Sequence, residues 1–387
     1  MVFLQKSIKK IYPHFFGFMI LAVPSNVLGQ FTFTTNGGYI TITGYNGLGG
    51  VVNIPSTING LTVTSLQGNA FGGNSKITGV TIPGGITNIG YSAFYSCRNL
   101  TNVILSNGVS SIVGDMFNDC TSLRNVAIPD SVTNIGGGAF IECALTTIAL
   151  PAGITSIGPS AFAGCTRLTN ATIPGRITAL DDFAFEYCTG LISVGLPDSI
   201  ANLGYATFAA CSNLASITIP DSVASIEDSE FEQCTSLTKV TVGKGLTNIG
   251  YGAFEVCENL TGVYFQGNAP AVGGDPDDGP VFYDNNNVTV YYLPGTTGWS
   301  NTYQGIPAVL WNPQIQTSDG YFGVSTNQFG FNITGTNSIP IVIEACTNLA
   351  NPVWTPLTNV SLTNGSFYFS DPQWTNYPGR FYGIGFP

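Results

Sequence analysis

A repeat of about 23 residues is the feature that most constrains how this chain can fold. Nine phenylalanines are spaced by 23 residues, apart from a single interval of 22. A unit this short cannot bury its own apolar side chains, so it must stack on copies of itself. We therefore predict a solenoid with a single interior file of rings. The file comprises Phe71, Phe94, Phe117, Phe140, Phe162, Phe185, Phe208, Phe231 and Phe254.

The pattern inside each unit predicts about 23 residues per coil and one short parallel strand per coil. In the unit after Phe117, Val126 and Ile128 alternate with polar residues, as in a strand with one face buried. Pro129 then ends the strand, and Leu123, Val132 and Ile135 supply further inward side chains.

A column of cysteines runs beside the phenylalanines, each three residues after a ring. Such residues are either small buried core fillers, disulfides between neighbouring coils, or metal or redox groups. Equivalent positions in a stack point the same way, which favours buried free thiols as a structural core column. Cys346 lies outside the series and is predicted to be a buried strand residue. The column comprises Cys97, Cys120, Cys143, Cys165, Cys188, Cys211, Cys234 and Cys257.

The recurring motifs Phe-x-x-Cys-x-x-Leu, Ile-Pro-Asp-Ser-Val and Asn-Ile-Gly cover residues 52 to about 265. In them the chain resembles the BspA-like leucine-rich repeats of exported and cell-surface proteins. It departs from better-known leucine-rich repeats because Cys precedes the strand and Pro follows it. Within the series, Asn74 replaces the first Cys, and Ser106 and Gly243 replace Pro. The resemblance implies partner binding or adhesion and no defined catalytic residues.

Residues 1–29 have the pattern of a cleavable signal peptide. Lys6, Lys9 and Lys10 precede the apolar run 15–23, and small residues follow near Gly29. Such a run is too short for the roughly 20 residues of a membrane helix, and no later segment reaches that length. A short buried helix is the alternative. We therefore expect an exported protein without a transmembrane segment in the mature chain.

The remaining boundaries follow from where the repeat starts and fails. Residues 30–66 are predicted to form an N-terminal cap and first coil, residues 67–265 the repeats, and residues 266–312 a C-terminal cap. Residues 315–387 alternate aromatic and polar side chains around an Asn364-Gly365 turn, which predicts a small all-β, sandwich-like domain.

Charge and composition exclude several classes of function. The 22 acidic and 11 basic residues give a net charge of −11, which would repel nucleic acid. The only histidine, His14, lies in the predicted signal peptide, so the mature chain lacks the usual acid–base group. We predict that the protein is not an enzyme and needs no cofactor; the alternative is a bound calcium ion.

Calcium candidates lie in the Asp-rich loop of Asp275, Asp277 and Asp278, with Asp284 beyond it, because hard cations prefer clustered oxygens. The alternative is a mobile cap loop. A second acidic group is interpreted as a solvated ridge, with a glycosidase carboxylate pair or a calcium site as alternatives. That group comprises Asp181, Asp182, Glu186, Glu227, Asp228, Glu230 and Glu232.

Outward positions of the predicted strands form the candidate binding surface, since the stacked strands of a solenoid make one extended surface to which ligands bind. Their side chains are short and nearly uncharged, and are interpreted either as a plain solvated face or as an adhesive one able to bond sugar hydroxyls. Arg124 and Tyr264 are the large anchors. The candidates are Asn102, Arg124, Asn125, Thr147, Asn170, Ser193, Ser216, Lys239 and Tyr264.

Taken together, these patterns predict a secreted or cell-surface bacterial protein that binds an unknown protein or glycan on a cell or matrix surface. One alternative is an exported protein that binds or acts on polysaccharide through carboxylates. The other is a structural component of an envelope or matrix.

Overall fold

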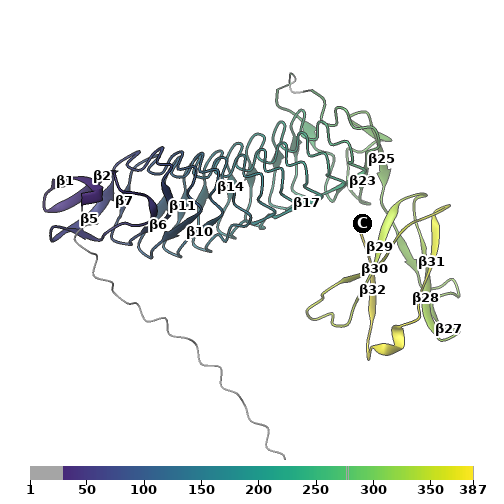
Figure 1. Cartoon of the computed structure of the whole chain (residues 1–387). Coiled ribbons are helices and arrows are strands. Elements are labelled where there is room, and N and C mark those ends of the chain that lie inside the picture. Colours follow the sequence, from purple (N-terminus) through teal and green to yellow (C-terminus); the bar gives the residue numbers. More distant parts are fainter. Residues whose placement is uncertain (1–28, 276, 278, 387) are drawn as a thin grey trace, which may run out of the picture.

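The computed structural model describes residues 29–275, 277 and 279–386. Figure 1 shows coils stacked along one axis from the N-terminal hairpin, with the C-terminal domain at the other end. The predicted solenoid is therefore confirmed. The predicted signal peptide lies outside the described residues except for Gly29.

The first strand of each coil pairs in parallel with its equivalents one repeat away, for example Asn125 with Asn102. We call this stack the first ladder. Inward residues such as Val103 and Leu105 are buried, whereas Asn102 and Ile104, which alternate with them along the same strand, are exposed. Its strands are β3 (Gly50–Asn53), β6 (Ile77–Ile82), β8 (Asn102–Leu105), β10 (Asn125–Ala127), β13 (Asn170–Thr172), β15 (Ser193–Gly195), β17 (Ser216–Ile219), β19 (Lys239–Val242), β21 (Gly262–Phe265), β23 (Thr289–Tyr292) and β25 (Ile306–Leu310).

A second strand of two residues follows in most coils, at the Asn-Ile step, and was not predicted. It forms a second parallel ladder, as where Asn134 pairs with both Ser111 and Ser156. Most coils are thus hydrogen-bonded to their neighbours along two sides. These strands are β7 (Asn88–Ile89), β9 (Ser111–Ile112), β11 (Asn134–Ile135), β12 (Ser156–Ile157), β14 (Ala179–Leu180), β16 (Asn202–Leu203), β18 (Ser225–Ile226), β20 (Asn248–Ile249) and β22 (Ala271–Val272).

The phenylalanines form the predicted interior file. Successive rings stack with centroids 4.7 to 5.7 Å apart and planes within 20° of parallel. Phe282 extends the file beyond Phe254, although the spacing there is 28 residues rather than 23. All these rings are buried, so the file is the centre of the core.

The cysteines lie beside this file and are buried free thiols. Each Sγ–H donates to the carbonyl of the phenylalanine one coil earlier, as from Cys188 to Phe162 at 3.2 Å. The other seven bonds are 3.1 to 3.2 Å long. Each of these carbonyls also accepts the backbone N–H three residues later, as Phe162 does from Cys165, so the thiol supplies a second donor that a methyl group could not.

The turn around each ring requires left-handed backbone at two fixed positions. The residues two before and two after the phenylalanine have positive φ, as with Gly138 and Glu142 around Phe140. Non-glycine residues such as Val256 (φ 53°) adopt the same conformation. The coil geometry therefore overrides the local preference of individual residues.

The shortened coil between Phe140 and Phe162 interrupts the first ladder. Residues 144–152 contain no strand, and hydrogen-bonded pairing stops at β10 and resumes at β13. Strand pairing is also absent between β15 and β17, but there both coils keep their strands. The single deletion in the repeat thus removes one strand from this face.

Antiparallel strands occupy the N-terminal end of the solenoid. A hairpin with a Gly37-Gly38 turn pairs with the coil through β5, and Phe31 and Tyr45 pack on Phe71 at the end of the ring file. These strands are β1 (Phe31–Asn36), β2 (Tyr39–Tyr45), β4 (Thr57–Ile58) and β5 (Leu61–Leu66).

Two antiparallel sheets make the C-terminal β-domain, in the order β26-β28-β27 with β31 on β28, and β30-β29-β32. Phe331, Ile343 and Phe369 lie in the core shared by the two sheets. The elements after β23 are β24 (Thr302–Tyr303), β26 (Gln314–Gln316), β27 (Gly323–Ser325), β28 (Gln328–Thr334), β29 (Pro340–Cys346), β30 (Thr355–Ser361), β31 (Ser366–Asp371), the short 3₁₀ helix η3 (Trp374–Asn376) and β32 (Phe381–Gly385).

Candidate functional site

The outward side of the first ladder from β8 to β17 is the main candidate surface, and we call it the strand face. Asn102, Arg124, Asn125, Thr147, Asn170, Ser193 and Ser216 are all exposed there. Adjacent coils are also linked through their side chains, because the Ser193 hydroxyl donates to Asn170 Oδ1 at 2.6 Å. The face is thus an array of short hydroxyl and amide groups, in which Thr147 belongs to the strandless residues 144–152.

A few larger side chains interrupt this polar array. Ile104 on β8 is 43% exposed, and Arg124 lies at the start of the next coil. Exposed apolar and Arg side chains are typical anchors of protein interfaces, whereas the surrounding short residues provide a flat surface. Arg124 was predicted and Ile104 was not, although the place of Ile104 two residues after Asn102 on an alternating strand indicates that its side chain faces outward.

The prediction that Tyr264 is an exposed anchor is wrong. Its side chain is only 4% exposed because the C-terminal domain packs over the end of the first ladder. The ring lies 4.8 Å from that of Tyr291 and 5.1 Å from that of Phe386. Tyr264 therefore belongs to an internal domain contact, together with Trp311.

Lys239, one coil earlier, is half-buried at the border of this contact. Burial lowers the pKa of its amine, and Glu344 of the C-terminal domain opposes that effect. The strand face is thus bounded at one end by the C-terminal domain and is open toward the N-terminus.

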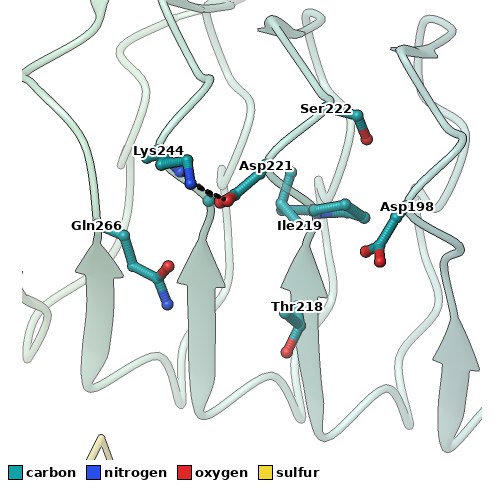
Figure 2. Close-up of a pocket in the computed structure, with 9 residues that line it drawn as sticks. Asp198, Thr218, Ile219, Asp221, Ser222, Lys244 and Gln266 are labelled. Carbon is teal, nitrogen blue, oxygen red and sulfur yellow. Dashed lines mark hydrogen bonds and ion pairs between the residues drawn. The ribbon is translucent and has the colours of Figure 1, made fainter.

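A hollow of about 580 Å³ opens at the carboxyl ends of β17 and β19, beside the strand face. Figure 2 shows Thr218 on its strand, with Asp221 and Lys244 above it joined by an ion pair of 2.9 Å. Asp198 and Gln266 line the hollow from the flanking coils. The pair is exposed to solvent, so its contribution to stability is small and its charges are accessible to a partner.

These rim residues were missed by the sequence analysis. Asp198 and Asp221 each follow the proline that ends a strand, and Lys244 follows Gly243 at the same repeat position. A comparison of the repeats at the residue after the strand-ending proline, and not only at the strand residues, would have identified them.

The acidic residues do not form one solvated ridge. Glu230 is fully buried, because it occupies the inward position directly before a file phenylalanine, where Ala184 and Ala253 lie in other coils. Burial raises the pKa values of Asp181 and Glu186, with smaller effects from the neighbouring Asp182 and Glu232.

No group of three potential metal-ligating side chains is found among the described residues. In the Asp-rich loop, Asp275 accepts the Asp277 N–H at 3.0 Å and donates its own N–H to Asp228 at 2.8 Å. Asp284 is exposed, and Asp278 lies outside the described residues. The calcium site stays a prediction.

The buried thiols have little nucleophilic character. Burial raises the pKa of Cys97 to about 11 and those of Cys165 and Cys257 to about 12. The thiolate is the reactive form, so the column is suited to packing rather than to chemistry at neutral pH.

A family model for the BspA type leucine rich repeat region matches residues 51–169 and 155–275, with six copies of the repeat. The chain belongs to the BspA-type leucine-rich repeat family. The comparison with curated proteins gives no match.

Several solved structures are similar to this BspA-type chain. A leucine-rich repeat protein of T. pallidum is 32% identical over 50% of this chain and 90% of its own, with a TM-score of 0.47. A leucine-rich repeat protein from Bacteroides ovatus is 23% identical, covering 73% and 98% of the two chains, with a TM-score of 0.43. The pneumococcal vaccine antigen PcpA is 14% identical, covering 73% and 96%, with a TM-score of 0.43.

Proposed function

We propose that this BspA-type protein is exported, displayed at a bacterial cell surface, and binds a partner protein through the strand face without catalysing a reaction. The observation that carries the proposal is the unbroken exposure of the outward residues from Asn102 to Ser216, in contrast to the burial of Tyr264. A repeat family of this kind serves generally as a scaffold for protein interactions.

The chemistry of the face supports a protein partner. Hydroxyl and amide groups can bond to backbone and side chains of many partners, and Arg124 and Ile104 provide a charged and an apolar anchor. The Asp221–Lys244 pair adds accessible charges of both signs at the rim.

Export and surface display rest on the N-terminal sequence pattern and on the family. Among the residues that the structure describes, no helix is long and apolar enough to cross a membrane. An exported chain of this kind would meet its partner outside the cell.

The test uses a purified panel of extracellular-matrix and bacterial surface proteins, with binding measured by biolayer interferometry. Ser193→Arg places a large charge in the middle of the face and is expected to weaken binding of at least one panel protein tenfold or more. Asn202→Arg is the matched control, since Asn202 is exposed on β16 of the second ladder in the same coil.

Two results would contradict the proposal. The first is equal loss of binding in both variants, which would indicate a surface other than the strand face. The second is hydrolysis of a glycan by the purified protein, with no panel protein bound.

A further inference from the structure

The C-terminal domain carries an aromatic hollow of about 660 Å³ beside β27, β28 and β31. Figure 1 labels these three strands. Tyr321, Phe322 and Tyr368 line it and are 63%, 46% and 46% exposed. Large aromatic side chains grouped on a surface are costly to leave in water and generally mark a binding site. We propose that this hollow binds a neutral carbohydrate, one that presents its sugar rings to the aromatic walls.

The two tyrosines make two walls of a corner. Their ring centroids are 6.2 Å apart and their planes are inclined by 68°. The face of an aromatic ring is electron-rich and attracts the weakly positive C–H groups on the face of a sugar. One tyrosine of the corner can therefore contact the face of a sugar ring, and the other tyrosine can contact the edge of the same sugar ring.

Local backbone features hold these rings in place. The Tyr321–Phe322 pair lies between Gly320 and Gly323, whose φ values of +85° and +129° favour glycine. On the adjacent strand, a Cβ at Gly330 would overlap the Tyr368 hydroxyl. Glycine at 330 thus allows the Tyr368 ring to lie along the sheet.

A polar group completes the hollow. Asp319 accepts the Tyr321 N–H at 3.0 Å through Oδ1 and the Asn332 side-chain amide at 2.8 Å through Oδ2. The second bond orients the Asn332 amide and leaves its carbonyl oxygen and second N–H for a ligand. A fixed amide beside aromatic faces matches the hydroxyl edge and the apolar face of a sugar.

The charges of the lining residues and of the whole chain indicate an uncharged ligand. No Lys, Arg or His is among the residues that line the hollow, and the whole chain carries a net charge of −11. Phosphate and acidic glycans would meet repulsion without a compensating cation. An uncharged glycan can contact the aromatic rings with its C–H groups and bond to the amide with its hydroxyl groups. This binding site is separate from the strand face.

Calorimetric titration of the purified protein with cellohexaose, xylohexaose, mannohexaose and chitohexaose tests the proposal. At least one oligosaccharide is expected to bind. Tyr321→Ala and Tyr368→Ala should each weaken that binding at least tenfold, whereas Tyr368→Phe, which keeps the ring, should weaken it less than threefold. Tyr91→Ala is the control, because Tyr91 is 72% exposed on the solenoid.

Circular dichroism of each variant verifies that the fold is retained. The proposal is overturned if none of the four sugars binds at millimolar concentration, or if both alanine variants bind as well as the parent. It is also overturned if the hollow holds a second copy of the chain, seen as a dimer that Tyr321→Ala dissociates. Unchanged sugar binding by Ser193→Arg would separate this site from the strand face.

Discussion

Glu230 should make the solenoid less stable as the pH rises. Its side chain is fully buried, Oε1 has no hydrogen-bond partner, and the Thr207 N–H donates to Oε2 over a long distance of 3.4 Å. Burial raises the pKa of this carboxyl well above its usual range, Glu227 and Asp182 act in the same direction, and bonds from Thr207 oppose them.

The sign of the effect follows from the raised pKa. In the unfolded chain the carboxyl loses its proton near pH 4.5, whereas in the folded chain it keeps the proton to higher pH. Between these two pKa values the folded state binds more protons, so the free energy of unfolding falls by about 1.4 kcal/mol per pH unit. Below about pH 4 the carboxyl is protonated in both the folded and the unfolded chain, so this destabilisation is absent.

The variant Glu230→Gln keeps the shape of the side chain and removes its titration. We expect its stability advantage over the parent to grow as the pH rises above about 4.5, by up to about 1.4 kcal/mol per pH unit. Urea unfolding followed by far-ultraviolet circular dichroism at pH 4, 5 and 6 measures the difference. Glu258→Gln removes the same charge from an exposed position and serves as the control. A gap between Glu230→Gln and the parent that stays constant from pH 4 to pH 6 would refute the reasoning.

Two further predictions concern the cores of the two domains. Phe185→Ala removes a ring stacked on both neighbours, 5.2 Å from Phe162 and 5.6 Å from Phe208, and should lower the free energy of unfolding by about 3 to 5 kcal/mol. Urea unfolding measures this loss. A loss of less than about 1 kcal/mol would contradict the conclusion that the ring file is the centre of the core. Arg380→Gln leaves the Asp371 carboxylate without its 2.8 Å ion pair, in side chains only 10% and 7% exposed. It should destabilise the C-terminal domain by about 3 to 5 kcal/mol, and an unshifted tryptophan-fluorescence transition would show that the pair is dispensable.

The solenoid could be predicted from the sequence because its core positions repeat with the chain. Phe94 and Phe117 occupy equivalent places in equivalent units, so one physical argument about a coil applies to every coil. The same argument fails after Phe254, where an insertion separates Phe282 from the repeat although its ring still stacks in the file. Two rings stack because they lie next to each other in the folded chain. The 23-residue spacing therefore predicts stacking only where no loop is inserted between the two coils.

The candidate site was predicted only where it depends on the coil itself. The outward direction of Asn102 or Ser193 follows from strand alternation, and the structure exposes both. The burial of Tyr264 depends on Phe386, more than one hundred residues later in the chain, and no local pattern indicates that contact. The left-handed conformation of Val256 is likewise imposed by the stack and not by the residue type.

The missing strand in residues 144–152 has a consequence for how the rod comes apart. In an array held by nearest-neighbour contacts, separation begins at the weakest junction rather than necessarily at an end. We expect the amino-terminal and carboxyl-terminal halves to behave as two cooperative blocks that part between β12 and β14, where neither ladder is paired, so that local opening starts in the middle of the molecule.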